Sequence, residues 1–419
     1  MEVTPGYKLT EAGIIPENWD VRLLEDLGRV VRGGSPRPAG DSRYFGGSFI
    51  RWLTVAALTN IEDHQIYVTE TAGFLTEEGS KHSRTLTKGT MIIANSGATL
   101  GVAKILGTTC CANDGIAAIT GQRIGDKEFV CQYFNTKTKY LREVVATGNG
   151  QPNLNTELIR KIAIPFPPIY EQRAIAAALS DVDVLLDSLD RLIAKKRNIK
   201  QAAMQQLLTG QTRLPGFSGE WEVVNMAKHA SLKARIGWQA LTTAEYLTSG
   251  AYYLVTGTDF LNGQVDWSSC HFVDQWRYSQ DRNIQLRNGD VLLTKDGTIG
   301  KVGYVKNLNG PATLNSGVYV IRPLNESFSP LFFFYVLTSK IFDDFLSRIT
   351  AGSTINHLYQ KDFVTFEFLA PELIEQTAIA TVLSDMDAEL AALEQRRDKS
   401  YIIKQGMMQE LLTGRIRLV

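Results

Sequence analysis

The feature that most constrains this chain is a repeated segment of 44 residues. Segment 171–214 aligns without a gap with segment 375–418, which begins 204 residues later, and 23 of the 44 positions are identical. Both copies open on Glu-Gln followed one residue later by Ala-Ile-Ala. Both close on Leu-Leu-Thr-Gly followed two residues later by Arg-Leu. Identity of this extent indicates a duplicated structural element, so the fold must contain this element twice.

Each copy predicts one long helix. Pro167-Pro168 and Pro371 precede the two copies, where proline is tolerated, and Gly210 and Gly414 follow at positions typical of helix C-caps. About 37 residues at about 1.5 Å each predict a rod of roughly 55 Å. Apolar residues recur at alternating spacings of four and three, the pattern of helices packed lengthwise. This seam consists of Ile175, Leu179, Val182, Leu186, Leu189, Ile193, Ile379, Leu383, Met386, Leu390 and Leu393.

A helix with such a seam needs an apolar partner along its length. The expected partner is the other copy, packed antiparallel; the alternative is that each helix docks only on its own globular neighbour. The chain then divides into a first globular block (1–166), a central helical spacer (167–215), a second globular block (216–370) and a C-terminal helical spacer (371–419).

Both globular blocks are rich in Gly, Thr, aromatic and β-branched residues, which predicts mixed α/β (α+β) domains with many turns. The predicted fold is therefore two such domains separated by two long helices in an antiparallel coiled coil, with a pseudo-twofold internal repeat. The blocks resemble each other only weakly, for example segment 86–101 with 286–300 and segment 146–154 with 350–358. Two diverged blocks on a nearly unchanged frame favour a protein that recognises two different things.

Charge and composition exclude little. The 44 basic residues balance the 44 acidic ones, which by itself weighs against nucleic-acid binding. Segment 29–51 nevertheless carries five arginines and one acid, and segment 228–239 carries only basic charges; such segments fit nucleic-acid contacts or ordinary solvated loops. The four cysteines and five histidines show no metal-ligand spacing. No signal peptide and no membrane-spanning run is found, so we expect a cytoplasmic protein.

Catalytic signatures are absent from the sequence. FPPIY at 166–170 lacks the Asn of the Asn-Pro-Pro-Tyr motif of amino-methyltransferases, and its position predicts a helix-entry turn. GTIGK at 297–301 lacks the spacing and the following Ser/Thr of a P-loop. No dinucleotide fingerprint, nucleophile elbow or Pro-Asp nuclease signature is found. Together these absences favour a binding protein over an enzyme.

With these motifs the chain resembles the DNA-specificity subunits of type I restriction-modification systems. The resemblance rests on YKLTEAGIIPENW at the start, the proline-led EQ-x-AIA helix openings, the two LLTG-x-x-RL closings and the variable blocks between them. It covers essentially the whole chain. It implies that each block is a target-recognition domain for one half of a bipartite double-stranded DNA site. The helices would set the spacing of the two halves.

The resemblance also implies partners. Two modification subunits would carry S-adenosylmethionine and methylate adenine, and two restriction subunits would use ATP and Mg²⁺ to translocate and cut DNA. The chain itself would bind no cofactor or metal and have no catalytic residue.

Specific DNA reading needs Arg, Lys, Asn, Gln or hydroxyl groups on loops. In the first domain, Gly-turn loops and basic segments supply the candidates Arg32, Ser35, Arg37, Arg51, Thr54, Lys81, Arg84, Ser96, Thr99, Asn149, Gln151 and Asn153. In the second domain they supply Lys233, Arg235, Gln239, Thr256, Thr258, Lys295, Thr298, Lys301, Ser353, Thr354 and His357. Each of these residues also fits an ordinary turn or core position.

Two other functions stay open at this point. The chain could be the recognition subunit of a type II system in which one partner both methylates and cuts, which only the neighbouring subunits would distinguish. It could also be a coiled-coil adaptor without a DNA role, although this leaves the divergence of the paired blocks unexplained.

Overall fold

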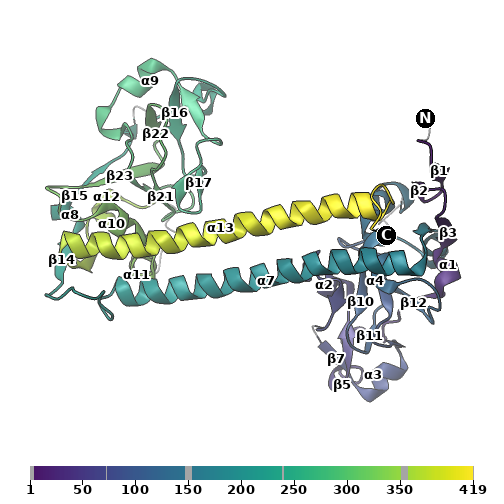
Figure 1. Cartoon of the computed structure of the whole chain (residues 1–419). Helices are drawn as coiled ribbons and strands as arrows, with labels where there is room; N and C mark the ends of the chain where they lie inside the picture. Colours follow the sequence, from purple (N-terminus) through teal and green to yellow (C-terminus); the bar gives the residue numbers. More distant parts are fainter. Residues whose placement is uncertain (1–3, 72, 147–152, 238–239, 351–356, 419) are drawn as a thin grey trace. The chain divides into compact units, whose positions relative to one another are not determined.

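The computed structural model describes residues 4–71, 73–146, 153–237, 240–350 and 357–418. The chain forms two compact units, residues 1–192 with 393–419 (unit 1) and residues 193–392 (unit 2). Each unit contains one globular domain and a part of each long helix (Figure 1). The long helices are α7 (Ile169–Leu207) and α13 (Leu373–Leu411), of 39 residues each, so the two predicted helices are confirmed at the predicted offset.

The globular domain of unit 1 is built mainly from two sheets. A five-stranded sheet has the order β4-β12-β9-β10-β6, and a four-stranded sheet has the order β7-β5-β11-β8. Its strands are β1 (Tyr7–Thr10), β2 (Gly13–Pro16), β3 (Asp20–Leu23), β4 (Arg29–Arg32), β5 (Phe45–Leu53), β6 (Tyr67–Val68), β7 (Gly73–Leu75), β8 (Arg84–Leu86), β9 (Met91–Ala94), β10 (Ala103–Leu106), β11 (Cys110–Ala112), β12 (Ile116–Thr120) and β13 (Ala163–Phe166). Its short helices are α1 (Leu24–Leu27), α2 (Val55–Leu58), α3 (Glu77–Lys81), α4 (Lys127–Thr136), α5 (Thr138–Tyr140), the π-helix η1 (Leu141–Val145) and α6 (Thr156–Arg160).

The globular domain of unit 2 repeats this plan. Its six-stranded sheet has the order β15-β23-β20-β21-β18-β17, and its three-stranded sheet has the order β19-β16-β22. The strands are β14 (Glu222–Asn225), β15 (Ala230–Lys233), β16 (Tyr252–Val255), β17 (Phe260–Leu261), β18 (Gln264–Val265), β19 (His271–Val273), β20 (Val291–Thr294), β21 (Val302–Tyr304), β22 (Ala312–Leu314), β23 (Val318–Pro323) and β24 (Glu367–Ala370). The helices are α8 (Met226–His229), η3 (Thr243–Glu245), α9 (Gln275–Ser279), η4 (Arg282–Ile284), α10 (Pro330–Leu337), α11 (Lys340–Thr350) and α12 (Gln360–Phe363).

Strand pairing makes the correspondence between the two domains explicit. In unit 1, β11 pairs parallel with β5 and β12 pairs antiparallel with β4 and β9. In unit 2, β22 pairs parallel with β16 and β23 pairs antiparallel with β15 and β20. The predicted α+β domains with an internal repeat are therefore confirmed. The predicted domain limits remain a prediction, and both long helices fall inside the segments predicted as spacers.

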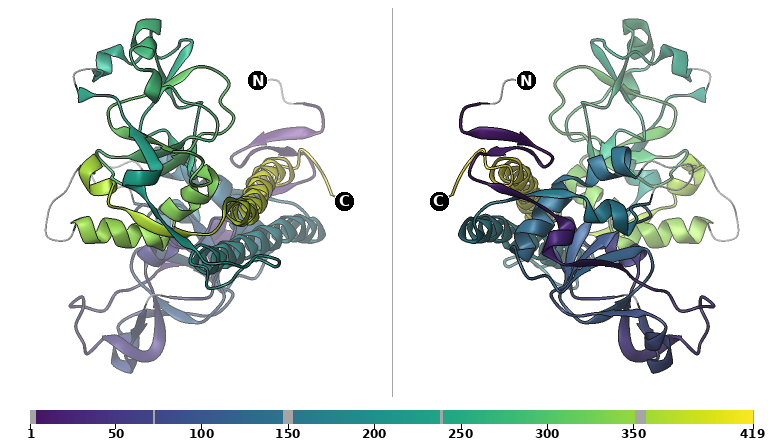
Figure 2. Two further views of the ribbon diagram at one scale, coloured as in Figure 1. Left: turned by 90° about the vertical axis from the view of Figure 1, so that its left-hand side faces the viewer. Right: turned by 90° about the vertical axis from the view of Figure 1, so that its right-hand side faces the viewer.

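Within each unit the two long helices run antiparallel, and the end-on views show them as neighbouring coils (Figure 2). In unit 1, Lys404 of α13 lies 2.6 Å from Asp183 of α7. In unit 2 the roles are exchanged, because Lys200 of α7 pairs with Asp387 of α13. These residues are equivalent across the repeat, so the exchange gives the pair its pseudo-twofold symmetry.

The predicted seam lies largely inside. Ile175, Leu179, Leu186, Leu189, Ile193, Ile379, Leu383 and Leu390 are buried, and Val182, Met386 and Leu393 are half-buried. Ile175 and Leu179 share one cluster with Trp19 of the first domain and with Leu411 of α13. Each helix start thus packs against both its own domain and the other helix, so the two partners considered from the sequence are not alternatives.

A clasp at the base of each domain explains the most strictly repeated motifs. Glu171, the first residue of the Glu-Gln motif, is fully buried and accepts hydrogen bonds from Arg417 Nη2 (2.7 Å) and Trp19 Nε1 (3.1 Å). The Arg417 guanidinium also lies 5.5 Å from the centre of the Trp19 ring. The glutamate comes from the first repeat and the arginine from the second, so the clasp joins the two copies.

Unit 2 contains the reciprocal clasp. Glu375 accepts both Nε and Nη2 of Arg213 at 2.5 Å, and Arg213 lies over the Trp221 ring at 5.8 Å. The glycine three residues before each clasp arginine, Gly210 or Gly414, has a φ of 69° or 70°, which confirms the predicted glycine caps. Side chains with a Cβ strongly disfavour this left-handed conformation.

The glutamine that follows each glutamate ties the helix start to its domain. Gln172 donates to Pro167 O (2.8 Å) and accepts from the backbone N–H of Asp126, the N-cap of α4. Gln376 does the same with Pro371 O and with Ser329, the N-cap of α10. The proline-led Glu-Gln motif is therefore a joint between long helix, domain and neighbouring repeat.

Candidate nucleic-acid interface

Four predicted DNA-binding residues of the first domain gather around Asp114. Arg32 Nε donates to the Asp114 carbonyl (2.5 Å), and Ser35 Oγ donates to the Asp114 carboxylate (2.6 Å). Arg37 lies 3.7 Å from the same carboxylate. Arg84 Nε donates to the carbonyl of Arg32 at 2.6 Å. We call these five residues the Asp114 cluster.

The backbone of this cluster is held tightly. Gly33 N–H and Gly34 N–H donate to Ile116 O (2.8 Å) and Ala112 O (2.9 Å), and Ser83 Oγ donates to Gly34 O at 2.6 Å. A Cβ on Gly33 would lie 2.1 Å from the Asn113 carbonyl, so only glycine permits this crossing of two backbone segments. The loop is thus preorganised by the fold.

The cluster carries an excess of positive charge. The Ser35 hydroxyl, with additional help from Arg32 and Arg37, holds the pKa of Asp114 below its usual value. Asp114 is therefore ionised at neutral pH, and it offsets one of the three arginine charges. The cluster fits a polyanionic partner that also offers hydrogen-bonding groups.

The remaining first-domain candidates are dispersed. Arg51, on β5, is half-buried and lies 5.5 Å from the centre of the Phe74 ring. Lys81 is exposed at the end of α3 and pairs with Glu78 at 3.2 Å. Thr54 precedes α2, Ser96 and Thr99 lie in the 95–101 turn, and Asn153 is exposed. Asn149 and Gln151 lie outside the described residues.

In the second domain the turns 256–259 and 294–301 come together. Lys301 Nζ donates to Gly257 O (3.2 Å). His357 Nδ1 pairs with Asp296, and the following backbone N–H of Leu358 donates to Lys295 O at 2.7 Å. Three candidates, Lys295, Lys301 and His357, are thus brought together, and Thr258 and Thr298 are exposed on the same two turns. Gln239, Ser353 and Thr354 lie outside the described residues.

Two second-domain candidates have structural positions instead. Arg235 is only 2% exposed, and its guanidinium donates to Leu314 O (2.8 Å) and to the side chains of Thr313 and Gln280 (both 3.2 Å). Burial lowers its pKa. Thr256 is 7% exposed and donates to the Asp259 carboxylate at 3.0 Å. The polar atoms of both side chains are therefore used inside the domain. Lys233, at the end of β15, is exposed in the place that Val31 takes in the first domain.

Sequence reasoning missed the acidic partners of these loops. Asp114 and Asp296 were not among the candidates, although the Asn-Asp-Gly turn at 113–115 was a usable signal for the first. Asp183 and Lys404, 8% and 3% exposed, were missed as well. Their signal is that both recur 204 residues away, as Asp387 and Lys200, next to the apolar seam.

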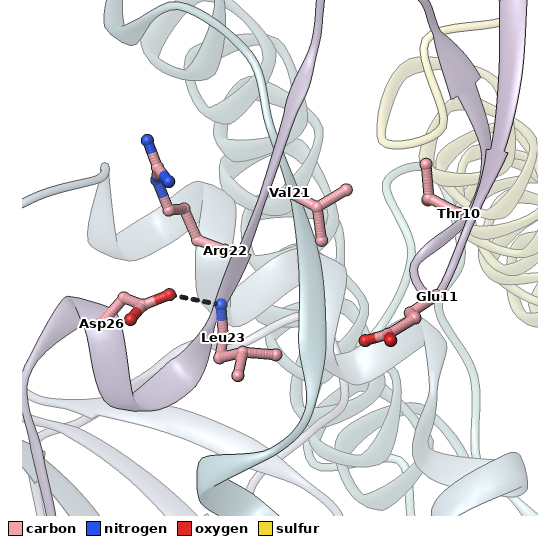
Figure 3. Close-up of a pocket in the computed structure, with 6 residues that line it drawn as sticks. All are labelled: Thr10, Glu11, Val21, Arg22, Leu23 and Asp26. Atoms are coloured by element: carbon pink, nitrogen blue, oxygen red, sulfur yellow. Dashed lines mark hydrogen bonds between the residues drawn. The ribbon is translucent and has the colours of Figure 1, made fainter.

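An open hollow of about 490 Å³ in unit 1 is lined by Thr10, Glu11, Val21, Arg22, Leu23 and Asp26 (Figure 3). Asp26 accepts a hydrogen bond from the Leu23 backbone N–H at 2.9 Å, so its carboxylate is used in capping α1. Among the described residues, no group of three or more His, Cys, Asp and Glu side chains could hold a metal ion. In the same part of the chain, no helix is long and apolar enough to span a bilayer.

Comparison with protein families decides the identity of this architecture. The model of the type I restriction modification DNA specificity domain matches twice, at residues 16–200 and 237–400, which together make up most of the chain. The chain belongs to this family. Each match covers most of one globular domain and most of the long helix that follows it, so the two matches follow the internal repeat.

Two relatives and one solved structure show the extent of the similarity. The MjaVIII specificity subunit of Methanocaldococcus jannaschii, a type I restriction enzyme subunit, is 23% identical over 96% of this chain and 94% of its own length. The MjaIX specificity subunit of the same organism is 32% identical over 43% of this chain and 42% of its own length. The crystal structure of the type I S subunit from M. genitalium matches with a TM-score of 0.61 over 97% of this specificity-domain chain and 98% of the other, at 16% identity, and so supports the fold.

Proposed function

We propose that this chain directs a type I restriction-modification complex to a bipartite DNA site, with one target-recognition domain reading each half. One observation carries the proposal: two domains of the same strand order stand on a repeated frame, yet their loops differ in chemistry. Where the first domain has Arg32 and Asp114, the second has Ala234 and Ser316. Family membership and the full-length relatives support this function, and nothing supports the type II or adaptor alternatives.

The remaining candidates enter the proposal as loop groups. In the first domain these are the Asp114 cluster, the 95–101 turn and residues 149–153. In the second domain they are the 256–259 and 294–301 turns with His357. Phosphate contacts from Lys and Arg would position the domains, and base contacts would specify the sequence. The balanced net charge suggests that partner subunits supply much of the phosphate contact, so binding should weaken strongly with salt.

We further infer that the two long helices set the distance between the half-sites. A helix of 39 residues is roughly 58 Å long, whereas half-sites one turn apart are separated by about 34 Å. The reciprocal clasps present two nearly equivalent frames, which fits the docking of two identical modification subunits. Those subunits would carry S-adenosylmethionine and methylate adenine. Two restriction subunits using ATP and Mg²⁺ would complete the complex, and this chain would contribute no catalytic group.

The test is co-expression of the full chain with its neighbouring modification subunit, followed by genome-wide mapping of adenine methylation by long-read sequencing. We expect one split motif with two short defined halves around a fixed unspecific gap. A continuous motif would contradict reading by two domains. A stable complex that methylates nothing, even with the restriction subunit added, would contradict the proposed function.

A further inference from the structure

The Asp114 cluster contains two guanidinium groups that the protein orients through one hydrogen bond each, while their remaining donors have no partner among the described residues. Arg32 and Arg84 each bind a backbone carbonyl through Nε, at 2.5 Å and 2.6 Å. Within the described part of the chain neither has any other hydrogen-bond or ion-pair partner, so both η nitrogens of each side chain remain available. Both side chains are exposed.

Holding two exposed arginine side chains in place costs conformational entropy, which a binding partner can offset. An exposed arginine normally samples many rotamers, and fixing it loses side-chain entropy. Here Nε and the tightly crossed Gly33–Gly34 backbone restrict the guanidinium plane, so less entropy remains to be lost on binding. Nη1 and Nη2 form a fork of two parallel donors, which matches two adjacent acceptors in one plane.

In the major groove, the O6 and N7 atoms of guanine are such a pair of acceptors. A phosphate also accepts such a fork, but the ionised Asp114 carboxylate offsets one of the three arginine charges and so weakens the attraction of the cluster for phosphate oxygens. A guanine edge is neutral, so this carboxylate does not weaken its two hydrogen bonds in the same way. The preset planes of the two forks therefore point to a planar base edge as their target.

We propose that Arg32 and Arg84 are specificity-determining residues that read guanine in the half-site of the first domain. This deepens the proposed function and rests on it. The second domain provides an internal contrast: strand register puts Ala234, the residue after β15, in the place of Arg32, and the fully buried Ile284 in the place of Arg84. The pair of arginine forks is therefore present in the first domain and not at the equivalent positions of the second.

The experiment compares methylation motifs of the full chain, co-expressed with its modification subunit, for wild type and single variants. Arg32→Ala and Arg84→Ala should each relax one G·C position in the same half-site, lowering discrimination there by roughly 10–100-fold. Arg32→Gln should move the preference at that position toward adenine, because glutamine matches the N6 and N7 atoms of adenine. The other half-site should not change.

Arg43→Ala is the matched control. Arg43 lies in the same basic segment, but its Nε and Nη2 are both engaged by Asp41 at 3.1 Å and 2.7 Å, so its loss should leave the motif unchanged. Binding of the purified complex to duplexes, measured against salt, separates base from phosphate contacts. Arg32→Ala should leave the salt slope unaltered, whereas loss of a phosphate contact reduces it by about one.

Several outcomes would overturn the inference. A wild-type split motif without any G·C pair in either half-site would contradict it, and this result does not depend on whether the variants fold. So would uniform weakening across all sequences with a reduced salt slope. The absence of any split motif would instead count against the proposed function, which keeps the two failures distinguishable.

Discussion

The clasp between Glu171 and Arg417 allows a quantitative test of how the two repeats are joined. We consider Arg417→Ala. Glu171 is 0% exposed, whereas the Arg417 side chain is 30% exposed. Removing the arginine leaves a buried carboxylate whose remaining partner is Trp19 Nε1 at 3.1 Å. Breaking a buried ion pair in this way typically costs about 3–5 kcal/mol, and the surviving indole bond and partial exposure place the expected cost near 3 kcal/mol.

The opposite substitution should cost less. In Glu171→Gln the arginine is left without its anion but can turn toward water, and the glutamine oxygen can still accept from Trp19. A cost of about 1–2 kcal/mol is expected, because no charge remains buried without compensation. The double variant should be less unstable than the sum of the two single variants, since removing either partner already breaks the pair.

Thermal unfolding measures these differences. Unit 1 comprises about 220 residues, for which about 1 kcal/mol corresponds to roughly 2–4 °C, so Arg417→Ala should lower the midpoint of the unit 1 transition by roughly 6–12 °C. The control is Arg415→Ala, which removes an exposed pair with Glu410 at 3.2 Å and should shift the midpoint by less than about 2 °C. Equal shifts for Arg415→Ala and Arg417→Ala would refute the reasoning. Arg213→Ala should reproduce the effect in unit 2.

Three further predictions concern the frame and the core. Gly414→Ala should lower the thermal unfolding midpoint more than Gly210→Ala. Both glycines have a left-handed φ, which costs a residue with a Cβ about 1–2 kcal/mol, but the added Cβ would lie 2.5 Å from Pro16 Cγ at position 414 and 3.2 Å from the Trp221 ring at position 210. Equal decreases in the midpoint would contradict this. Lys404→Met should cost about 3 kcal/mol at pH 7. Burial already raises the pKa of Asp183, so the folded state binds its proton more tightly than the unfolded state, and the deficit of this variant should shrink as pH falls from about 7 to 5; a pH-independent deficit in urea unfolding would contradict that. Thiol reagents at about pH 8 should modify none of the four buried cysteines before the protein unfolds, because burial raises the pKa of three of them to about 12. Rapid modification of the native protein would contradict this prediction. These three are Cys110, Cys131 and Cys270.

The sequence by itself determined the frame. The 204-residue repeat, the prolines before each helix and the glycines after it are local signals, and the observed helices lie at the predicted places. The apolar seam could be predicted from the sequence because helix geometry fixes which residues share a face, whatever the helix packs against. The antiparallel partner followed from the need to bury that seam twice in one chain.

Tertiary structure alone decided which polar residues are free to act. Arg235 and Arg32 look alike in sequence, each a basic residue at or just after the strand that opens its domain's sheet, yet the first is buried and fully engaged and the second is exposed. The burial and hydrogen bonding of each side chain depend on a segment some 80 residues away, which contains Leu314 for Arg235 and Asp114 for Arg32. The clasp pairs Glu171 with a residue 246 positions later. Such partners are set by chain crossings in space, and local propensity and periodicity contain no information about them.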